Sequence, residues 1–397
     1  MYFEVLNTIS WWPAFFAAVN IFFVYYFTQV VQRPRLISAD GPLKEFLRYN
    51  VHTISEKYWP TFWCLGGAAQ MLIANAIRQL VLPKINYRRE ILKLKDGGEL
   101  ALHWLEAGCS ENAPCIILIP GLIGEPQTDY VRSLATIANK AGLRVVLCNY
   151  RGLGGVTLKT PRFYTLNCYE DLAEAIRHVH EKLPKDCKLG CVALSLGTFM
   201  LGAYLAQEEE ASKYLTAAMM ISPPCDIKFG VINLEKPYFN KIFNHSMMRE
   251  VLKLFKHYSI LRKSNIDVDL VLTSKTLGAF INNLLVKSSL FASLEECYED
   301  AKLHNKLGNI TIPLLCLCAA DDIFQPIQAL PLEIVEKSSN VAMVLSEYGG
   351  HIGFLEGWWP FRREQYMERL FVEYFTKVLF DENGSFQRLK EQLNKTN

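Results

Sequence analysis

The sequence of 397 residues predicts an α/β fold with a mostly parallel sheet that opens with an antiparallel hairpin. Three observations support this: short apolar runs recur along the chain, helical patterns separate them, and a hairpin pattern precedes them. The hairpin comprises Arg88–Lys95 and Glu99–Leu105, joined by a Lys-Asp-Gly-Gly turn. Near-continuous apolar runs, typical of strands buried on both faces, cover Cys115–Ile119, Val145–Asn149, Leu189–Ser195, Ala217–Ser222, Pro313–Ala319 and Val341–Ser346.

The composition indicates an ordered chain and argues against several function classes. Half of the residues are hydrophobic and only 21% are charged, which excludes disorder. Because 42 Lys and Arg residues oppose 40 Asp and Glu residues, the chain lacks the basic excess of a nucleic-acid-binding protein. The 11 cysteines contain no CxxC pair, which argues against a disulfide framework and a zinc site. Phosphate-binding glycine motifs are missing too, so we expect neither a metal nor a cofactor.

The first 35 residues predict a membrane anchor. No charged residue occurs between Val5 and Gln32, and a helix over about residues 11–31 is roughly 30 Å long, which matches the hydrocarbon core of a bilayer. A cleavable signal would need a basic region before the apolar stretch, but the only early charge is Glu4. The alternative is a buried helix of a soluble protein. We expect a single-pass anchor that is not removed.

The charges beside this segment give a partial indication of its orientation. Arg33 and Arg35 follow it and Glu4 precedes it, which favours a body on the cytosolic side, as do the unpaired cysteines. Four glycosylation sequons oppose this weakly, at Asn244, Asn309, Asn383 and Asn394. We expect an intracellular membrane such as the endoplasmic reticulum, with the side of the membrane and any protein partners left open.

Behind the anchor the sequence divides into four further parts. Residues 36–84 form a helical connector that either packs on the body or lies in the membrane interface. Residues 85–222 and 313–385 form the α/β core, and residues 386–397 a C-terminal tail. The 90-residue stretch 223–312 is too long for a loop and predicts a helical cap or lid. The basic face of its main helix is either solvated or in contact with lipid head groups.

A candidate nucleophile lies where a strand pattern changes to a helical one. Ser195 is the central residue of Ala193-Leu194-Ser195-Leu196-Gly197, with small residues at the second position on either side. A sharp strand-to-helix turn requires such neighbours, and it exposes the serine hydroxyl at the positive end of a helix. The alternative is an ordinary serine in a turn.

An acid and a histidine follow two later strands, in the order that this kind of site requires. Asp322 follows the apolar run that ends at Ala319, and His351 follows two glycines after the last run. Carboxyl ends of parallel strands meet at one edge of a sheet, so these side chains are expected to lie near Ser195. Asp321 is the alternative acid.

Two backbone N–H groups are candidates for an oxyanion hole, the pair of donors that stabilises a negatively charged oxygen. One belongs to Leu196, directly after the candidate nucleophile. The other belongs to Leu122, in the loop Pro120-Gly121-Leu122-Ile123-Gly124 after an early strand.

Several of these segments resemble a known family. They are Tyr58-Trp59-Pro60-Thr61, Pro120-Gly121-Leu122, Asn149-Tyr150-Arg151-Gly152, Thr160-Pro161-Arg162, the serine turn, Asp321-Asp322 and Gly349-Gly350-His351-Ile352-Gly353-Phe354-Leu355-Glu356-Gly357. With the anchor, they resemble α/β-hydrolase domain-containing proteins of the YheT type, most of all the eukaryotic members one and three. The resemblance implies an α/β-hydrolase fold and a triad at Ser195, Asp322 and His351. The family usually has glycine where this chain has Ala193 and Thr198.

The resemblance also implies membrane-bound esterase or phospholipase activity, in some members on phosphatidylcholines with medium-length acyl chains. Our leading hypothesis is a membrane-anchored serine hydrolase that cleaves such phospholipids or acylglycerols. Two alternatives remain open: a non-catalytic membrane scaffold or lipid-binding protein that keeps the fold, and a lipid transacylase that uses the same triad.

Overall fold

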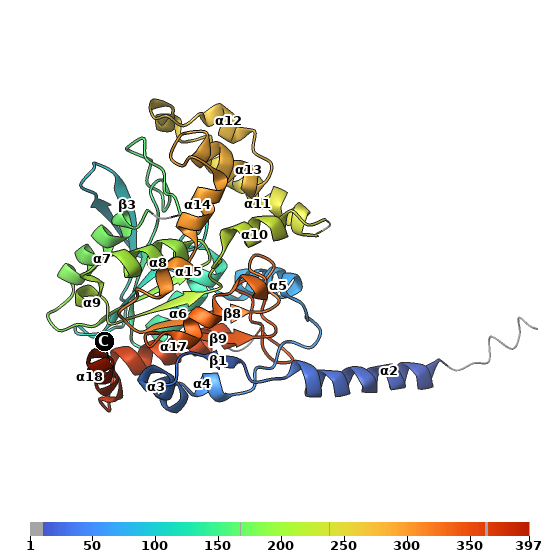
Figure 1. Ribbon diagram of the computed structural model, residues 1–397. Helices are drawn as coiled ribbons and strands as arrows, with labels where there is room; N and C mark the ends of the chain where they lie inside the picture. The colour runs from blue at the N-terminus through green and yellow to red at the C-terminus, as the bar shows by residue number, and fades with distance from the viewer. Residues whose placement is uncertain (1–10, 167, 238, 362–363, 397) are drawn as a thin grey trace, which may run out of the picture.

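The computed structural model describes residues 11–166, 168–237, 239–361 and 364–396. Its centre is a nine-stranded sheet with the order β1-β9-β8-β7-β6-β4-β5-β3-β2, and the strands β4 to β9 are parallel (Figure 1). The strands are β1 (Arg35–Ile37), β2 (Arg88–Lys93), β3 (Glu99–Leu105), β4 (Cys115–Ile119), β5 (Arg144–Cys148), β6 (Leu189–Leu194), β7 (Ala217–Ile221), β8 (Leu314–Ala319) and β9 (Val341–Ser346). The predicted α/β fold with a mostly parallel sheet is confirmed.

The two edges of the sheet differ in how well the sequence predicted them. At one edge β2 and β3 form the predicted hairpin, and β3 runs antiparallel to β5. At the other edge β1 pairs antiparallel with β9, with Arg35 opposite Leu345. This strand was not predicted, because three residues carry no detectable alternation. It ties the chain directly after the N-terminal helix to the sheet.

Helices cover both faces of the sheet and its carboxyl edge. They are α2 (Trp12–Tyr25), α3 (Pro42–Asn50), α4 (His52–Ser55), α5 (Gly67–Val81), α6 (Asp129–Lys140), α7 (Glu170–Lys182), α8 (Gly197–Gln207), α9 (Ala211–Tyr214), α10 (Ile227–Leu234), α11 (Phe239–Phe255), α12 (Val268–Leu272), α13 (Leu277–Ile281), α14 (Leu294–Ala301), α15 (His304–Leu307), α16 (Leu332–Lys337), α17 (Tyr366–Leu379) and α18 (Ser385–Thr396). One face packs on α3, α6 and α17, and the other on α7, α8 and α16.

The helices α10 to α15 lie between β7 and β8 in the chain; α11 to α14 stand above the sheet, whereas α15 packs beside α8 (Figure 1). Their buried side chains, among them Val231, Met248 and Phe280, belong to the same apolar cluster as α7 and α8. This packing makes the segment a continuation of the core, which closes over the ends of the strands.

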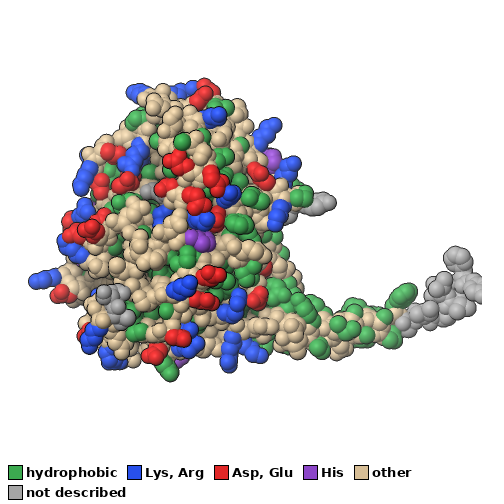
Figure 2. Space-filling model, viewed as in Figure 1, with side chains coloured by type: hydrophobic (Ala, Val, Ile, Leu, Met, Phe, Trp, Pro, Cys, Tyr) green, Lys and Arg blue, Asp and Glu red, His purple; other side chains and the backbone are tan. Residues whose placement is uncertain are grey.

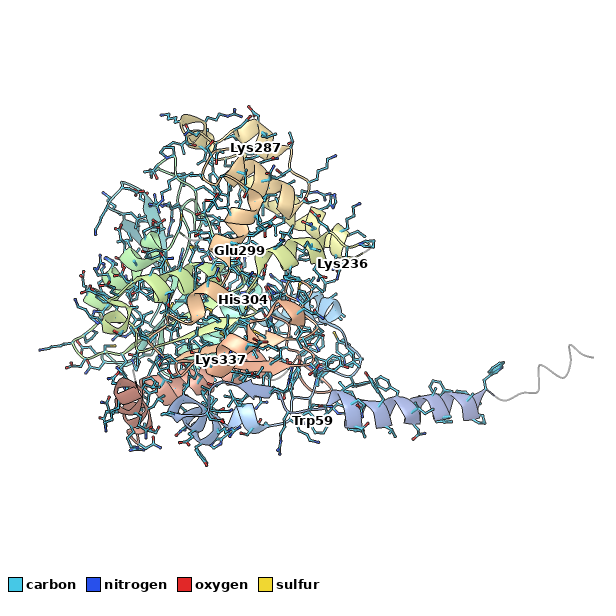
Figure 3. All side chains as sticks on the ribbon, in the orientation of Figure 1. Trp59, Lys236, Lys287, Glu299, His304 and Lys337 are labelled. Atoms are coloured by element: carbon cyan, nitrogen blue, oxygen red, sulfur yellow. The ribbon has the colours of Figure 1, made fainter. Side chains whose placement is uncertain are left out.

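The N-terminal helix is long and apolar enough to cross a membrane by its length and composition. It comprises α2 and a π-helical turn, η2 (Tyr26–Val30), and it projects from the body with its side chains exposed (Figures 1 and 2). Its base packs on the body: Tyr26 and Val30 are buried, and the Tyr26 hydroxyl donates to the Pro60 carbonyl at 2.6 Å. Trp59 lies beside this base (Figure 3).

The C-terminal residues and the Asn244 sequon both pack against other parts of the chain. The residues 385–396, which largely coincide with the expected C-terminal tail, form α18, and its apolar side chains pack on α3, with the Phe386 and Phe46 ring centroids 5.5 Å apart. Among the sequons, Asn244 is fully buried and its side-chain oxygen accepts a hydrogen bond from the Leu277 N–H at 3.0 Å. A glycan on Asn244 is incompatible with this packing.

Candidate active site

Ser195 lies on a sharp turn between β6 and α8. Its φ is 48°, a left-handed conformation that is strained for a residue with a side chain and typical of a nucleophile at such a turn. A Cβ atom at Gly197 would lie 2.6 Å from the carbonyl oxygen of Pro120, so the turn requires glycine there. The turn therefore holds the half-buried serine at the end of the strand, where it lines a cavity.

The two unusual residues of this turn, Ala193 and Thr198, are accommodated without narrowing the cavity beside Ser195. Ala193 lies within β6, paired with Ile119 and Met220, and its methyl group belongs to the apolar core. Thr198 is fully buried, and its hydroxyl donates to the Ser195 carbonyl at 2.6 Å. Thr198 is not among the described residues that line the cavity beside Ser195.

The structure brings His351 and Asp322 to Ser195, in the arrangement that the sequence predicts. The His351 Nε2 lies 2.8 Å from the Ser195 Oγ, and the His351 Nδ1 lies 2.8 Å from the Asp322 Oδ2. Both His351 and Asp322 are buried. The second oxygen of Asp322 accepts the N–H of Phe324 at 2.7 Å, and the Phe324 ring lies 4.3 Å from the imidazole ring between centroids. The imidazole is thus held on both sides.

Asp321, the alternative acid, has a different position. Its Oδ1 accepts the N–H of Gly350 at 2.8 Å, so it holds the backbone of the histidine loop and does not contact the imidazole. Burial, together with the charge of Asp322, raises the pKa of Asp321 to about 6. Of the two acids, Asp322 is therefore the partner of His351.

The two candidate oxyanion donors, Leu122 and Leu196, line the same cavity as Ser195. Within the described part of the chain neither N–H group has a hydrogen-bond partner, whereas a backbone donor of a folded protein is normally paired. Both N–H groups are thus available to a bound oxygen atom.

The loop that carries Leu122 is held by three side chains to which the sequence analysis gave no role, those of Tyr130, Asn149 and Tyr150. The Tyr130 hydroxyl accepts the N–H of Gly121 at 3.0 Å, and the Tyr150 hydroxyl donates to the carbonyl of Pro120. Asn149 donates to the carbonyl of Gly124 at 2.8 Å. Asn149 and Tyr150 belong to the Asn-Tyr-Arg-Gly segment, so the family resemblance was the signal that pointed to them.

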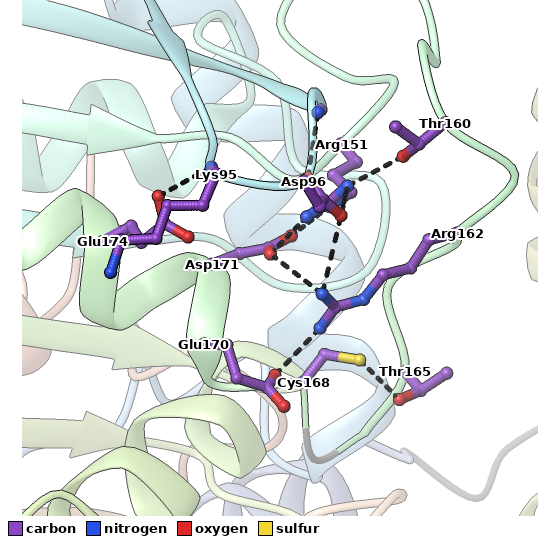
Figure 4. Close-up of polar contacts among 11 residues, drawn as sticks. Lys95, Asp96, Arg151, Thr160, Arg162, Thr165, Cys168, Glu170, Asp171 and Glu174 are labelled. Carbon is purple, nitrogen blue, oxygen red and sulfur yellow. Dashed lines mark hydrogen bonds and ion pairs between the residues drawn. The ribbon is translucent and has the colours of Figure 1, made fainter.

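A buried ion-pair network holds the next part of that segment (Figure 4). Arg151 is 2% exposed, pairs with both oxygens of Asp171 and lies 2.8 Å from Asp96 in the hairpin turn. It also donates to Thr160 at 2.9 Å, and Arg162 bridges Asp96 and Glu170. The network joins the β2–β3 turn to α7. It also fixes the beginning of the segment from Arg151 to Tyr164, and Tyr164 lines the cavity.

A second buried arginine holds the histidine loop. Arg78 of α5 donates to the carbonyls of Ile352 at 2.8 Å and Gly353 at 3.0 Å, and it pairs with Glu368 at 3.2 Å. Ser222 accepts the N–H of Ile352 at 3.1 Å. The connector therefore takes part in the site, although the only sequence signal was one charged residue in an apolar helix.

A cavity of about 540 Å³ extends from Ser195 between the sheet and the helices above it. This volume suits a small-molecule site, and the wall is mostly apolar. Side chains from α8, α10, α11 and α13 form this wall, including Phe199, Leu234, Met248 and Phe280. Among the described residues no group of His, Cys, Asp and Glu is arranged to hold a metal ion.

Comparisons with known proteins give the family. No protein-family model matches the chain. Phospholipase ABHD3 of Bos taurus is 32% identical over 361 residues, which cover 89% of this chain and 87% of that protein. Monoacylglycerol lipase ABHD2 of Bos taurus is 25% identical over 364 residues, covering 87% of this chain and 85% of that protein. The esterase Pf2001 of Pyrococcus furiosus covers 78% of this chain and 92% of its own, with 16% identity and a TM-score of 0.45. The chain therefore belongs to the α/β-hydrolase domain-containing family that includes phospholipase ABHD3.

Proposed function

We propose that this carboxylic ester hydrolase is a membrane-anchored serine lipase, with Ser195 as nucleophile, His351 as general base and Asp322 as the acid that orients the imidazole. The observation that carries the proposal is the continuous hydrogen-bonded chain from the Ser195 Oγ through both nitrogens of His351 to Asp322. In this arrangement Asp322 favours the tautomer that leaves Nε2 free to accept the serine proton.

The reaction follows from these positions. Nε2 of His351 takes the Ser195 proton while Oγ attacks the ester carbonyl, and the N–H groups of Leu122 and Leu196 stabilise the resulting oxyanion. Collapse of this intermediate breaks the ester bond, and His351 returns the proton to the departing alcohol. Water then attacks the acyl group on Ser195 with His351 again as base, which releases a carboxylic acid and restores the serine.

The cavity supports a lipid as the substrate. Its mostly apolar wall accommodates an acyl chain, whereas a polar ester would leave its hydrogen-bonding groups unpaired there. The relatives are named as a phospholipase and a monoacylglycerol lipase. We therefore propose phosphatidylcholine-type phospholipids with medium-length chains, or acylglycerols, as the substrate class.

The N-terminal helix supports the membrane location. The helical span Trp12–Val30 has 19 residues, is apolar and is mostly exposed, as a membrane helix must be in the absence of lipid. An anchor keeps the enzyme beside an insoluble substrate and raises the rate of encounter. We propose a single-pass protein of an intracellular membrane such as the endoplasmic reticulum.

The proposal is tested with the full chain in phosphatidylcholine liposomes. Medium-chain phosphatidylcholine and a monoacylglycerol are supplied in separate reactions, and the products are identified by mass spectrometry. We expect free fatty acid from at least one substrate with the wild type and with Ser212→Ala, a matched control on an exposed residue of α9, and none with Ser195→Ala. Acyl groups recovered on another lipid would indicate a transacylase. A folded wild type without turnover would contradict the proposal and favour a scaffold.

A further inference from the structure

Helix α5 exposes an apolar face. Leu72, Ala76 and Leu80 follow one another at intervals of four residues, and the two leucines are 47% and 80% exposed. Arg78, the one charged residue of this helix, points inward and is buried. A helix in contact with water normally carries charged groups on its outer face, so this face is suited to an apolar surrounding.

The neighbouring helices of the insertion expose apolar side chains as well. Phe229 and Ile232 on α10 are 42% and 54% exposed, and Ile242 on α11 is 71% exposed. Figure 1 shows α5, α10 and the start of α11 on the side of the body toward which the N-terminal helix projects, and Figure 2 shows hydrophobic side chains there. Lys236, also on this side in Figure 3, flanks the apolar residues.

The length of the N-terminal helix constrains where a bilayer lies. The span Trp12–Val30 is about 28 Å long, close to the roughly 30 Å of a hydrocarbon core. From Phe23 onward, however, the helix contacts the body, so the described part that stands free measures only about 16 Å. A bilayer that holds the whole helix therefore also reaches the body around its base.

The side chains around this base are those preferred at a membrane surface. Four tryptophans, Trp59, Trp63, Trp358 and Trp359, are between 38% and 61% exposed. Trp358 stacks on Phe23 of the helix at 6.1 Å between ring centroids, and Trp63 donates to the Trp358 carbonyl at 3.0 Å. Tryptophan is enriched at the level of lipid head groups, where its ring is partly apolar and its N–H is solvated.

The cavity reaches the surface between the same helices. Leu72 and Asn75 of α5, and Ser246 and Glu250 of α11, line the cavity and are also exposed. Ser195 and His351 line the same cavity. An opening between α5 and α11 therefore connects this exposed apolar surface with the reacting groups.

We propose that these helices form a membrane-docking face, made up of Leu72, Ala76, Leu80, Phe229, Ile232 and Ile242, that lies in the head-group region of the bilayer around the anchor. A lipid then enters the cavity from the bilayer between α5 and α11 without crossing water. The inference rests on the proposed function in that the N-terminal helix spans the membrane. It adds a second membrane contact and the route by which the substrate reaches Ser195.

The first test locates the docking face independently of activity. Leu80→Cys, Ile232→Cys and Ile242→Cys are prepared in the full chain, with Ile91→Cys as a matched control on β2, a strand at the far edge of the sheet. Each variant is labelled with a thiol-reactive fluorophore and reconstituted in phosphatidylcholine liposomes with or without brominated acyl chains; the parent chain gives the background from native cysteines. We expect at least twofold quenching at 80, 232 and 242 and none at 91. Equal quenching at all four positions, or none, would overturn the proposal.

The second test links the face to substrate entry. None of Leu80, Ile232 and Ile242 lines the cavity among the described residues, so Leu80→Glu with Ile242→Glu leaves the site itself unaltered. We expect the double variant to hydrolyse a soluble short-chain ester at the wild-type rate and phosphatidylcholine in liposomes at least fivefold more slowly. Ile91→Glu should behave as the wild type on both substrates. Equal slowing on both substrates would contradict the entry route. If the wild type hydrolysed neither substrate, that result would count against the proposed function alone.

Discussion

The two walls of the cavity are constructed differently. On the sheet side, polar side chains fix each functional loop: Tyr150 holds the loop of Leu122, and Arg78 and Ser222 hold the loop of His351. On the side of α10 to α13, the lining is largely apolar and makes packing contacts, as at Val231 and Phe280. Hydrogen bonds have direction and fix reacting atoms, whereas apolar packing selects by volume. The comparison predicts that changes on the sheet side lower kcat and changes on the other side alter substrate choice.

The largest effect on the sheet side is expected from the triad. Ser195→Ala removes the proposed nucleophile, and Asp322→Asn destabilises the histidine tautomer that the proposed mechanism requires, so each should lower kcat by about 10⁴-fold or more. The melting temperature should change little in Ser195→Ala, since only one hydroxyl is lost. Hydrolysis of a chromogenic ester and thermal unfolding measure both quantities. Activity of Ser195→Ala within tenfold of the wild type would remove this serine from the mechanism.

A smaller effect is expected from a residue that only positions the loop of Leu122, the proposed oxyanion donor. Tyr150→Phe removes the donor to the Pro120 carbonyl, and a buried carbonyl without a partner costs about 1–3 kcal/mol. If that cost is expressed as a displaced loop, kcat should fall about 10- to 100-fold with KM within about twofold, because Tyr150 does not line the described cavity. Tyr49→Phe on the exposed face of α3 is the control. A change in KM alone would contradict the positioning role.

On the opposite wall, Met247→Trp tests selection by volume. Met247 lines the cavity, so a larger side chain should lower kcat/KM for long acyl chains about tenfold relative to short ones. Met247→Leu keeps the volume and should leave the chain-length profile unchanged. A series of esters of increasing chain length measures the profile. If kcat/KM of Met247→Trp fell equally for all chain lengths, this wall would position the reacting groups as well.

The smallest effect concerns stability and pH at Asp321. Because burial raises its pKa from 3.8 to about 6, the folded chain keeps a proton that the unfolded chain releases between those values. Stability therefore falls as the pH rises through this window. Asp321→Asn removes the titration and keeps an acceptor for Gly350, so from about pH 4 to pH 7 the stability of this variant should rise by about 2 kcal/mol relative to that of the wild type. Urea unfolding of both proteins at about pH 4 and pH 7 measures their free energies of unfolding. If the variant differed from the wild type by the same amount at both pH values, the prediction would be wrong.

Sequence patterns were sufficient where the physical requirement is local. Buried parallel strands need continuous apolar runs, which gave β4 to β9, and a strand-to-helix turn needs small neighbours, which singled out Ser195. The order of elements in the fold then indicated Asp322 and His351. These predictions depended on short-range patterns and on topology, both of which a single sequence carries.

The supporting contacts were not predictable, because they join distant segments. Arg78 reaches a loop 274 positions away, and β1 pairs with β9 across most of the chain. For the acid, the sequence favoured Asp322 and kept Asp321 as the alternative, and the direction of the two carboxylates comes from the structure, where Asp322 faces the imidazole and Asp321 accepts the N–H of Gly350. Side-chain direction over such separations is a tertiary property that a local pattern does not carry.

Labelling with a fluorophosphonate probe tests the central claim most directly, because the probe reacts with an activated serine and needs no knowledge of the natural substrate. The wild type, Ser195→Ala, His351→Ala and Ser212→Ala are compared as full chains in membranes. We predict strong labelling of the wild type and Ser212→Ala, and none of Ser195→Ala or His351→Ala. A folded wild type that is not labelled, or labelling that survives in Ser195→Ala, would contradict the account.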